Sequence, residues 1–167
     1  MKKLFVLVMI FSFITSFLLA NSLELGSPAP QLEVLTDQGT TLDLSEALSV
    51  GTTLVFFYPK AMTPGCVKQA CSLRDGWDEL QSRNVSIFGI SSDTAKTQAQ
   101  FRDKYTLPFT LLADTDGQIA DAFSKSRWSR QAYIFKDGIL VWRDLKAATS
   151  KQATEILAAL DELEPNS

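Results

Sequence analysis

The stretch TTLVFFYPKAMTPGCVKQAC, residues 52–71, decides the fold and also holds both cysteines of the chain, Cys66 and Cys71. Its first part, Thr52–Tyr58, is a continuous run of β-branched and aromatic residues. Such a run is typical of a strand that is buried on both faces of a sheet. The sequence therefore predicts that a central strand leads directly into the segment that carries the cysteines.

A helix is expected from Pro64 to about Gln81. Proline suits the first turn of a helix, and Thr63 just before it suits the N-cap position. Cys66 would then lie in the first helical turn, close to backbone N–H groups that have no partner within the helix. These groups and the helix dipole favour negative charge, so a thiolate forms readily at this position.

The rest of the chain alternates between strand patterns and helix patterns. Residues 23–36 are expected to be an extended lead-in with little regular structure. Further strands are expected at 40–44, 85–90, 109–112, 131–135 and 139–143, and the last two are expected to pair as a hairpin across Lys136-Asp137-Gly138. One further helix, capped by Asp93 or Thr94, is expected to run to about Tyr105, and others are expected at about 118–123 and at 150–163. This order predicts an α/β fold of the thioredoxin-like type, with a central mixed β-sheet flanked by helices.

The first twenty residues differ from the rest of the 167-residue chain. Lys2 and Lys3 precede an almost wholly apolar run, Leu4–Leu19, which is followed by Ala20. This layout predicts a secretory signal peptide over residues 1–20 and export to a periplasm or lumen-like compartment, with an uncleaved anchor over residues 4–20 as the alternative. Residues 21–167 are expected to form a single domain.

Several classes of function are disfavoured by composition. The chain has no histidine, which removes Ser-His-Asp and Cys-His hydrolase mechanisms and argues against a zinc site. The acidic residues Asp114, Asp116 and Asp121 do not match the spacing of a calcium loop. The 16 basic residues are scattered through the sequence and do not predict a nucleic-acid surface.

The spacing of Cys66 and Cys71 indicates redox chemistry. Five residues of intact α-helix separate two Cα atoms by roughly 8.6 Å, whereas a disulfide needs about 4.4–6.8 Å. The two cysteines can therefore pair only where the segment is not helical or where its first turns unwind. A purely structural disulfide between them would disrupt the helix that carries both cysteines. Without histidine, an arginine is the natural cation to stabilise a thiolate here.

The motif Pro59-x-x-x-Thr63-x-x-Cys66, followed by Cys71, resembles the peroxiredoxin family. The adjoining Arg74-Asp75 pair is similar to the bacterioferritin comigratory protein group, also called the peroxiredoxin Q group. The similarity extends over about residues 23–160. Three further segments carry it: Gly89–Asp93, Phe101–Asp114 and Arg130–Gly138.

The resemblance implies a role for each matching residue. Cys66 would be the peroxidatic nucleophile, Thr63 would hydrogen-bond at the thiolate and the peroxide, and Pro59 would shield the pocket. Arg130 would hold the thiolate charge and polarise the O–O bond. Cys71 would be the resolving cysteine, which forms a Cys66–Cys71 disulfide. The implied substrates are hydrogen peroxide and alkyl hydroperoxides, the implied reductant is a thioredoxin-like protein, and the group favours a monomer. The resemblance implies no metal and no organic cofactor.

The chain departs from the group at three positions. Ala61 and Gln69 replace acidic residues that are common there, and Ser124 replaces a glycine. Because the loop 124–129 contains a second arginine, Arg127 competes with the motif arginine for the place beside the thiol.

Two other functions compete with a peroxidase. An exported thiol–disulfide exchange protein is disfavoured because the chain lacks the Cys-x-x-Cys pattern of that class. A binding module of thioredoxin-like fold, with its two cysteines as an inert clamp, would not react with peroxide.

Overall fold

The computed structural model describes residues 23–164, which form one mixed sheet with helices on both faces. The strands are β1 (Glu33–Thr36), β2 (Thr41–Asp43), β3 (Thr52–Phe57), β4 (Val85–Ser91), β5 (Thr110–Ala113), β6 (Gln131–Lys136) and β7 (Ile139–Asp144). They are arranged in the order β2-β1-β5-β4-β3-β6-β7. The three central strands are parallel, and all other pairings are antiparallel, which confirms the predicted mixed sheet.

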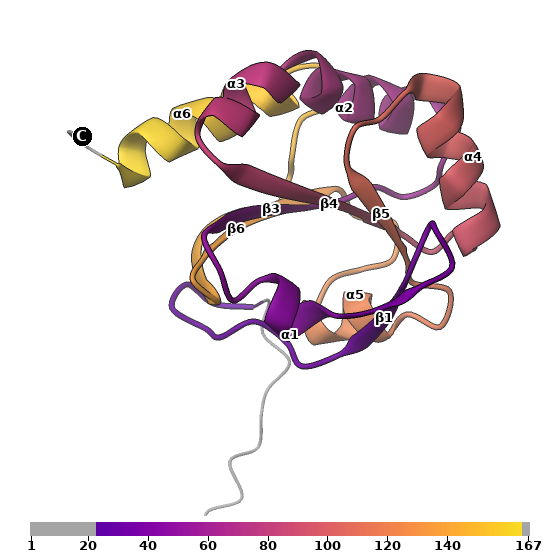
Figure 1. Ribbon diagram of the computed structural model, residues 1–167, viewed down its shortest axis with the longest axis horizontal. Helices are drawn as coiled ribbons and strands as arrows, with labels where there is room; N and C mark the ends of the chain where they lie inside the picture. Colours follow the sequence, from indigo (N-terminus) through magenta and orange to yellow (C-terminus); the bar gives the residue numbers. More distant parts are fainter. Residues whose placement is uncertain (1–22, 165–167) are drawn as a thin grey trace, which may run out of the picture.

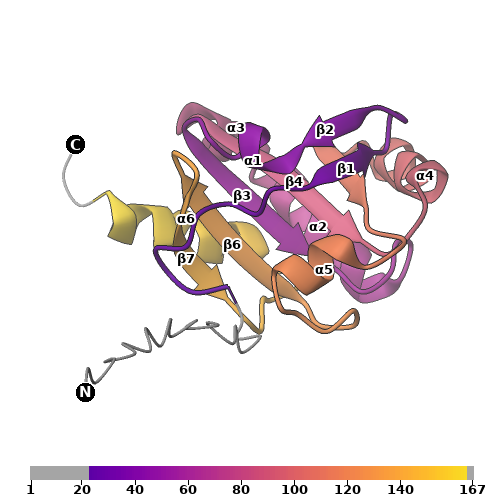
Figure 2. The same cartoon turned by 90° about the horizontal axis from the view of Figure 1, so that it is seen from below.

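The helices form two layers of unequal size (Figures 1 and 2). They are α1 (Leu44–Ala47), α2 (Pro64–Asp75), α3 (Trp77–Ser82), α4 (Ala95–Tyr105), α5 (Gln118–Ala122) and α6 (Gln152–Leu163). The larger layer consists of α2, α3, α4 and α6 on one face of the sheet. The short helices α1 and α5 cover the other face.

The central strand β3 supplies side chains to both layers, as its unbroken apolar run predicts. Leu54 and Phe56 belong to the core beneath α2, α4 and α6. Val55 and Phe57 belong to the second core, beneath α1 and α5. Successive side chains of a strand point to opposite faces, so a strand buried on both sides carries apolar residues at consecutive positions, as Leu54–Phe57 does.

The helix predicted from Pro64 to Gln81 is in fact two helices, and the break lies at Gly76. A Cβ atom at Gly76 would lie 2.8 Å from the Cβ of Ala153 in α6. The glycine therefore allows α6 to pack directly against the end of α2. This constraint arises from a residue 77 positions away, and a local helix pattern does not contain it.

The prediction of little regular structure over residues 23–36 is wrong at its end. Glu33–Thr36 forms β1, which pairs with both β2 and β5. The strand expected at residues 40–44 ends at Asp43, because the Asp43 carboxylate accepts the N–H of Glu46 at 3.0 Å and starts α1. Acceptance of that N–H by an aspartate is ordinary N-cap chemistry.

The predicted signal peptide, residues 1–20, lies outside the described residues and stays a prediction. Within residues 23–164, no helix is both long and apolar enough to cross a membrane.

Candidate active site

Cys66 is the third residue of α2, and α2 begins just beyond the carboxyl end of β3. The first hydrogen bond of the helix runs from the N–H of Val67 to the carbonyl of Thr63, at 2.9 Å. The N–H groups of Gly65 and Cys66 precede this bond, so the helix itself provides no acceptor for them. The thiol is only 1% exposed, which places it inside the core rather than on the surface.

Arg130 supplies the positive charge at this thiol. It stands immediately before β6, which is paired with β3, so the sheet brings it next to the start of α2. Its Nη2 lies 3.5 Å from the Sγ of Cys66 and donates a hydrogen bond to it. Gly65 makes room for the guanidinium, because a Cβ there would lie 3.2 Å from Nη2.

The structure places the competing arginine elsewhere. The Nη2 of Arg127 donates to the carbonyl of Thr115, at 3.3 Å, in the turn before α5. Of the two arginines, Arg130 is therefore the one that contacts the thiol.

Thr63 and Pro59 lie in the loop between β3 and α2. Thr63 occupies the N-cap position, but its Oγ1 donates to the carbonyl of Lys60 at 2.8 Å and caps no helix N–H. Its hydroxyl oxygen keeps free lone pairs and can still accept a proton donor. Pro59 opens the loop and is half-buried. Met62 completes it with φ of 65°, a left-handed conformation that is uncommon for a residue with a side chain.

Asp93 fixes this loop from the neighbouring strand. Its Oδ2 accepts the N–H of Ala61 at 2.7 Å and the hydroxyl of Ser91, also at 2.7 Å. The sequence suggested Asp93 or Thr94 as the cap of α4, and the cap is Thr94, whose Oγ1 accepts the N–H of Thr97 at 3.2 Å. The role of Asp93 in holding the cysteine loop was missed, because it depends on β4 lying beside β3.

A buried polar network continues from this carboxylate beneath the loop. The hydroxyl of Tyr58 donates to Oε1 of Gln98, whose Nε2 donates to Oγ of Ser91 at 3.0 Å and to the carbonyl of Leu112 at 2.9 Å. Burial raises the pKa of Tyr58 well above its usual value near 10. The phenol therefore stays neutral and acts as a rigid support in the same apolar cluster as Cys66.

Cys71 lies in the same continuous helix as Cys66, and both thiols are free. Cys71 is half-buried, whereas Cys66 is fully buried. Five helical residues place their Cα atoms roughly 8.6 Å apart, beyond the reach of a disulfide. The helix must open before the two sulfur atoms can bond.

Two glutamines extend the site toward α6. Nη1 of Arg130 donates to Oε1 of Gln69, and Nε2 of Gln69 donates to Oε1 of Gln152 at 2.8 Å. Both glutamines are fully buried. From the sequence, Gln69 is only a departure from the group pattern, and Gln152 was not predicted to belong to the site because no residue near it in the sequence marks it.

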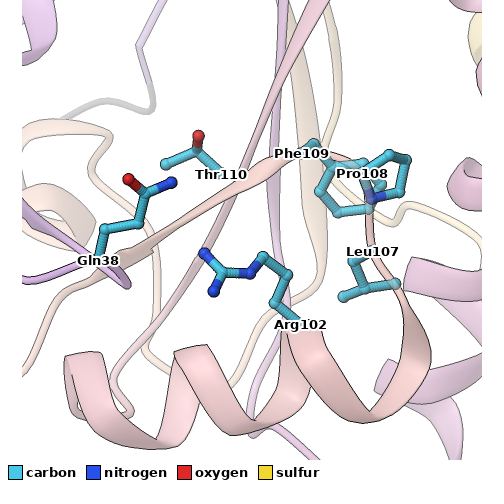
Figure 3. A pocket seen from close by; sticks show the side chains of 6 residues that line it. All are labelled: Gln38, Arg102, Leu107, Pro108, Phe109 and Thr110. Carbon is cyan, nitrogen blue, oxygen red and sulfur yellow. The ribbon is translucent and has the colours of Figure 1, made fainter.

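A separate shallow cavity of about 270 Å³ lies near the end of α4 and the start of β5 (Figure 3). Its lining residues, Gln38, Arg102 and Leu107–Thr110, include none of the residues described at the cysteine site. The arginine of the cavity, Arg102, is paired with the buried carboxylate of Asp37 and with Asp103. This cavity is therefore distinct from the cysteine site.

The loop before Arg130 contains a partly buried lysine. The Nζ of Lys125 lies 4.6 Å from the ring centroid of Phe57 and donates to the carbonyl of Ser126 at 2.8 Å. Burial lowers the pKa of Lys125 to about 8, although the Asp114 carboxylate acts in the opposite direction.

This lowered pKa predicts a pH dependence of stability. Since the folded-state pKa of Lys125 lies below its ordinary value of 10.5, the charged form costs stability below pH 8, and stability rises from pH 8 to 10.5. The free energy of unfolding of Lys125→Met, minus that of the parent protein, should therefore be larger at pH 7 than at pH 10.5. The expected change is about 1 kcal/mol after allowance for the partial exposure of Lys125. Urea unfolding at several pH values measures this difference. Lys151→Met, which removes an exposed charge, should show no such trend.

Comparison with known proteins agrees with this geometry. Residues 25–143 match the family model described as the AhpC/TSA family. Escherichia coli K12 "Peroxiredoxin Bcp" is 40% identical over 121 residues, which cover 71% of this chain and 76% of that protein. A Coxiella burnetii "Putative peroxiredoxin bcp" is 42% identical over 102 residues, or 61% and 67% of the two chains. The crystal structure of Mycobacterium tuberculosis BcpB matches with a TM-score of 0.78 at 30% identity, over 87% of this chain and 99% of that one. The structural match confirms the predicted thioredoxin-like fold of peroxiredoxin type.

Proposed function

Because the chain belongs to the AhpC/TSA family and to its Bcp group of thiol peroxidases, we propose that Cys66 is the peroxidatic nucleophile and that Cys71 resolves its oxidised form. The proposed substrates are hydrogen peroxide and organic hydroperoxides. The observation that carries the proposal is the hydrogen bond from Arg130 to the Sγ of Cys66, made where α2 begins.

In the first step, the Cys66 thiolate attacks one peroxide oxygen, and the S–O bond forms as the O–O bond breaks. The other oxygen leaves as hydroxide or alkoxide and takes up a proton, so the sulfur becomes a sulfenic acid and the peroxide is reduced. Before the attack, Arg130 and the N–H groups of Gly65 and Cys66 stabilise the negative charge of the Cys66 thiolate. The guanidinium also stabilises the charge that grows on the departing oxygen. Thr63 can orient the peroxide by accepting its O–H.

In the second step, the thiolate of Cys71 attacks the sulfenic sulfur, and the product is the Cys66–Cys71 disulfide with release of water. A thioredoxin-like dithiol then reduces this disulfide by exchange and is itself oxidised. Export directed by residues 1–20 would place both steps outside the cytosol, where the donor must be a thioredoxin-like protein of that compartment.

The proposal is tested by mixing reduced protein with hydrogen peroxide in a stopped-flow instrument and following tryptophan fluorescence. We expect a fast phase, orders of magnitude above the rate of a free thiol, that is absent from Cys66→Ser. A rate like that of a simple thiol would instead favour an exchange protein or an inert clamp. Disulfide-reductase activity toward a protein substrate separates those two.

A further inference from the structure

The segment that leads into and begins α6, Thr149–Ala153, contacts α2 at several points along its length, and α6 lies in the same layer as α2 (Figure 1). At one end, a Cβ on Gly65 would lie 3.7 Å from the Cγ2 of Thr149, just before α6. Further along, the N–H of Ala153 donates to Oγ of Ser72 at 3.1 Å. At the far end, Gly76 touches Ala153 so closely that a Cβ would collide with it.

Within this contact, the orientation of the two buried glutamines is fixed by Arg130. A guanidinium has only donors, so Gln69 must present Oε1 to it and turn Nε2 toward Gln152. Gln152 must in turn present Oε1. Its own Nε2 is then left buried without a hydrogen-bond partner among the residues 23–164.

This arrangement ties the chemistry of α2 to α6. Gln69 lies between Cys66 and Cys71, so any unwinding that brings the two sulfur atoms together displaces it. The bond from Gln69 to Gln152 is then lost, and Gln152 is released toward water. The bond from Gln69 to Gln152 stabilises the helical form of α2. The unpaired Nε2 of Gln152 destabilises that form, because a buried donor without an acceptor is costly.

We propose that Gln152 is a positioning residue that holds α2 helical across the two cysteines and so sets the rate at which the Cys66 sulfenic acid is resolved. The proposal rests on the function proposed above. The sulfenic acid has two fates. Attack by Cys71 gives the disulfide and water, whereas attack on a second peroxide gives the sulfinic acid and reduces that peroxide to water. Slow opening of α2 favours the second fate.

The test is Gln152→Met, which keeps the length of the side chain and removes the acceptor for Gln69. The helical form loses one hydrogen bond, and the unpaired buried Nε2 is then that of Gln69 instead of that of Gln152, so disulfide formation should become faster by several-fold, up to about tenfold. The peroxide concentration that gives half sulfinic acid should rise by about the same factor, because the two fates compete. The rate of the first step should stay within about twofold of the parent, since Arg130 keeps its bond to Gln69. Amide hydrogen exchange in α2 should be faster.

Two controls separate this role from general loosening. Gln152→Glu retains an acceptor oxygen for Nε2 of Gln69, so its resolution rate should not show the acceleration expected of Gln152→Met. Leu160→Ala removes core packing two turns further along α6 and should leave that rate unchanged. Equal acceleration in Leu160→Ala, or none in Gln152→Met, would overturn the proposal. Absence of any peroxide reaction at Cys66 would instead reject the proposed function.

Discussion

Replacing Arg130 with methionine is expected to lower the rate constant for oxidation of Cys66 by hydrogen peroxide by about 10²–10³-fold, the usual cost of one preorganised donor. Arg130 is the cation that hydrogen-bonds to the thiol. Its loss leaves only the N–H groups at the start of α2 to hold the thiolate and the departing oxygen. Stopped-flow fluorescence over a range of peroxide concentrations measures the constant.

Two companion variants make this expectation specific. Arg127→Met removes a positive charge from the same loop, but from a side chain that bonds to the carbonyl of Thr115. Its rate constant for oxidation of Cys66 should therefore stay within about twofold of the parent value. Arg130→Lys should fall between parent and methionine, because one ammonium cannot reach both Cys66 and Gln69 as the planar fork does. If Arg127→Met and Arg130→Met lowered the rate constant equally, the effect would be one of net charge only. The assignment of Arg130 as the cation at the thiol would then be wrong.

The features predicted correctly from sequence are those encoded by neighbouring residues. The apolar run of β3 reports burial on both faces because strand side chains alternate. Pro64 marks the start of α2, and the Lys136-Asp137-Gly138 turn joins β6 to β7, as a two-strand hairpin signal should. In each case the physical cause lies within a few positions in the chain.

The features that were missed depend on packing between distant segments. The residue at the end of α2, Gly76, has no room for a side chain because Ala153 of α6 packs against it. Asp93 was one of two residues expected to cap α4. It holds the cysteine loop instead, because the pairing of β4 with β3 brings it to Ala61. Gln152 is the clearest case, since its partner Gln69 is 83 positions away and no local pattern distinguishes a clamping glutamine from an exposed one.

Replacing Cys71 with serine is expected to stop disulfide formation while leaving the first step within about twofold of the parent. Serine keeps the size of the side chain and lacks the nucleophilic thiolate. Without an internal thiol in the same helix, the sulfenic acid at Cys66 persists and takes up a second oxygen as peroxide increases. Turnover with a thioredoxin-like donor should fall by at least about a hundredfold, since the substrate of that donor is the disulfide.

Mass spectrometry of the intact protein decides the outcome. After one equivalent of peroxide the parent should lose two hydrogens as its disulfide forms, whereas Cys71→Ser should gain one oxygen. The variant should gain a second oxygen only when further peroxide is added. A small dithiol in excess should restore turnover in the variant if it reaches Cys66, because any accessible thiol can attack a sulfenic acid. Undiminished turnover of the variant with the protein donor would show that the donor attacks Cys66 directly. The intact helix between the cysteines would then be a permanent barrier, and α2 would have no reason to open.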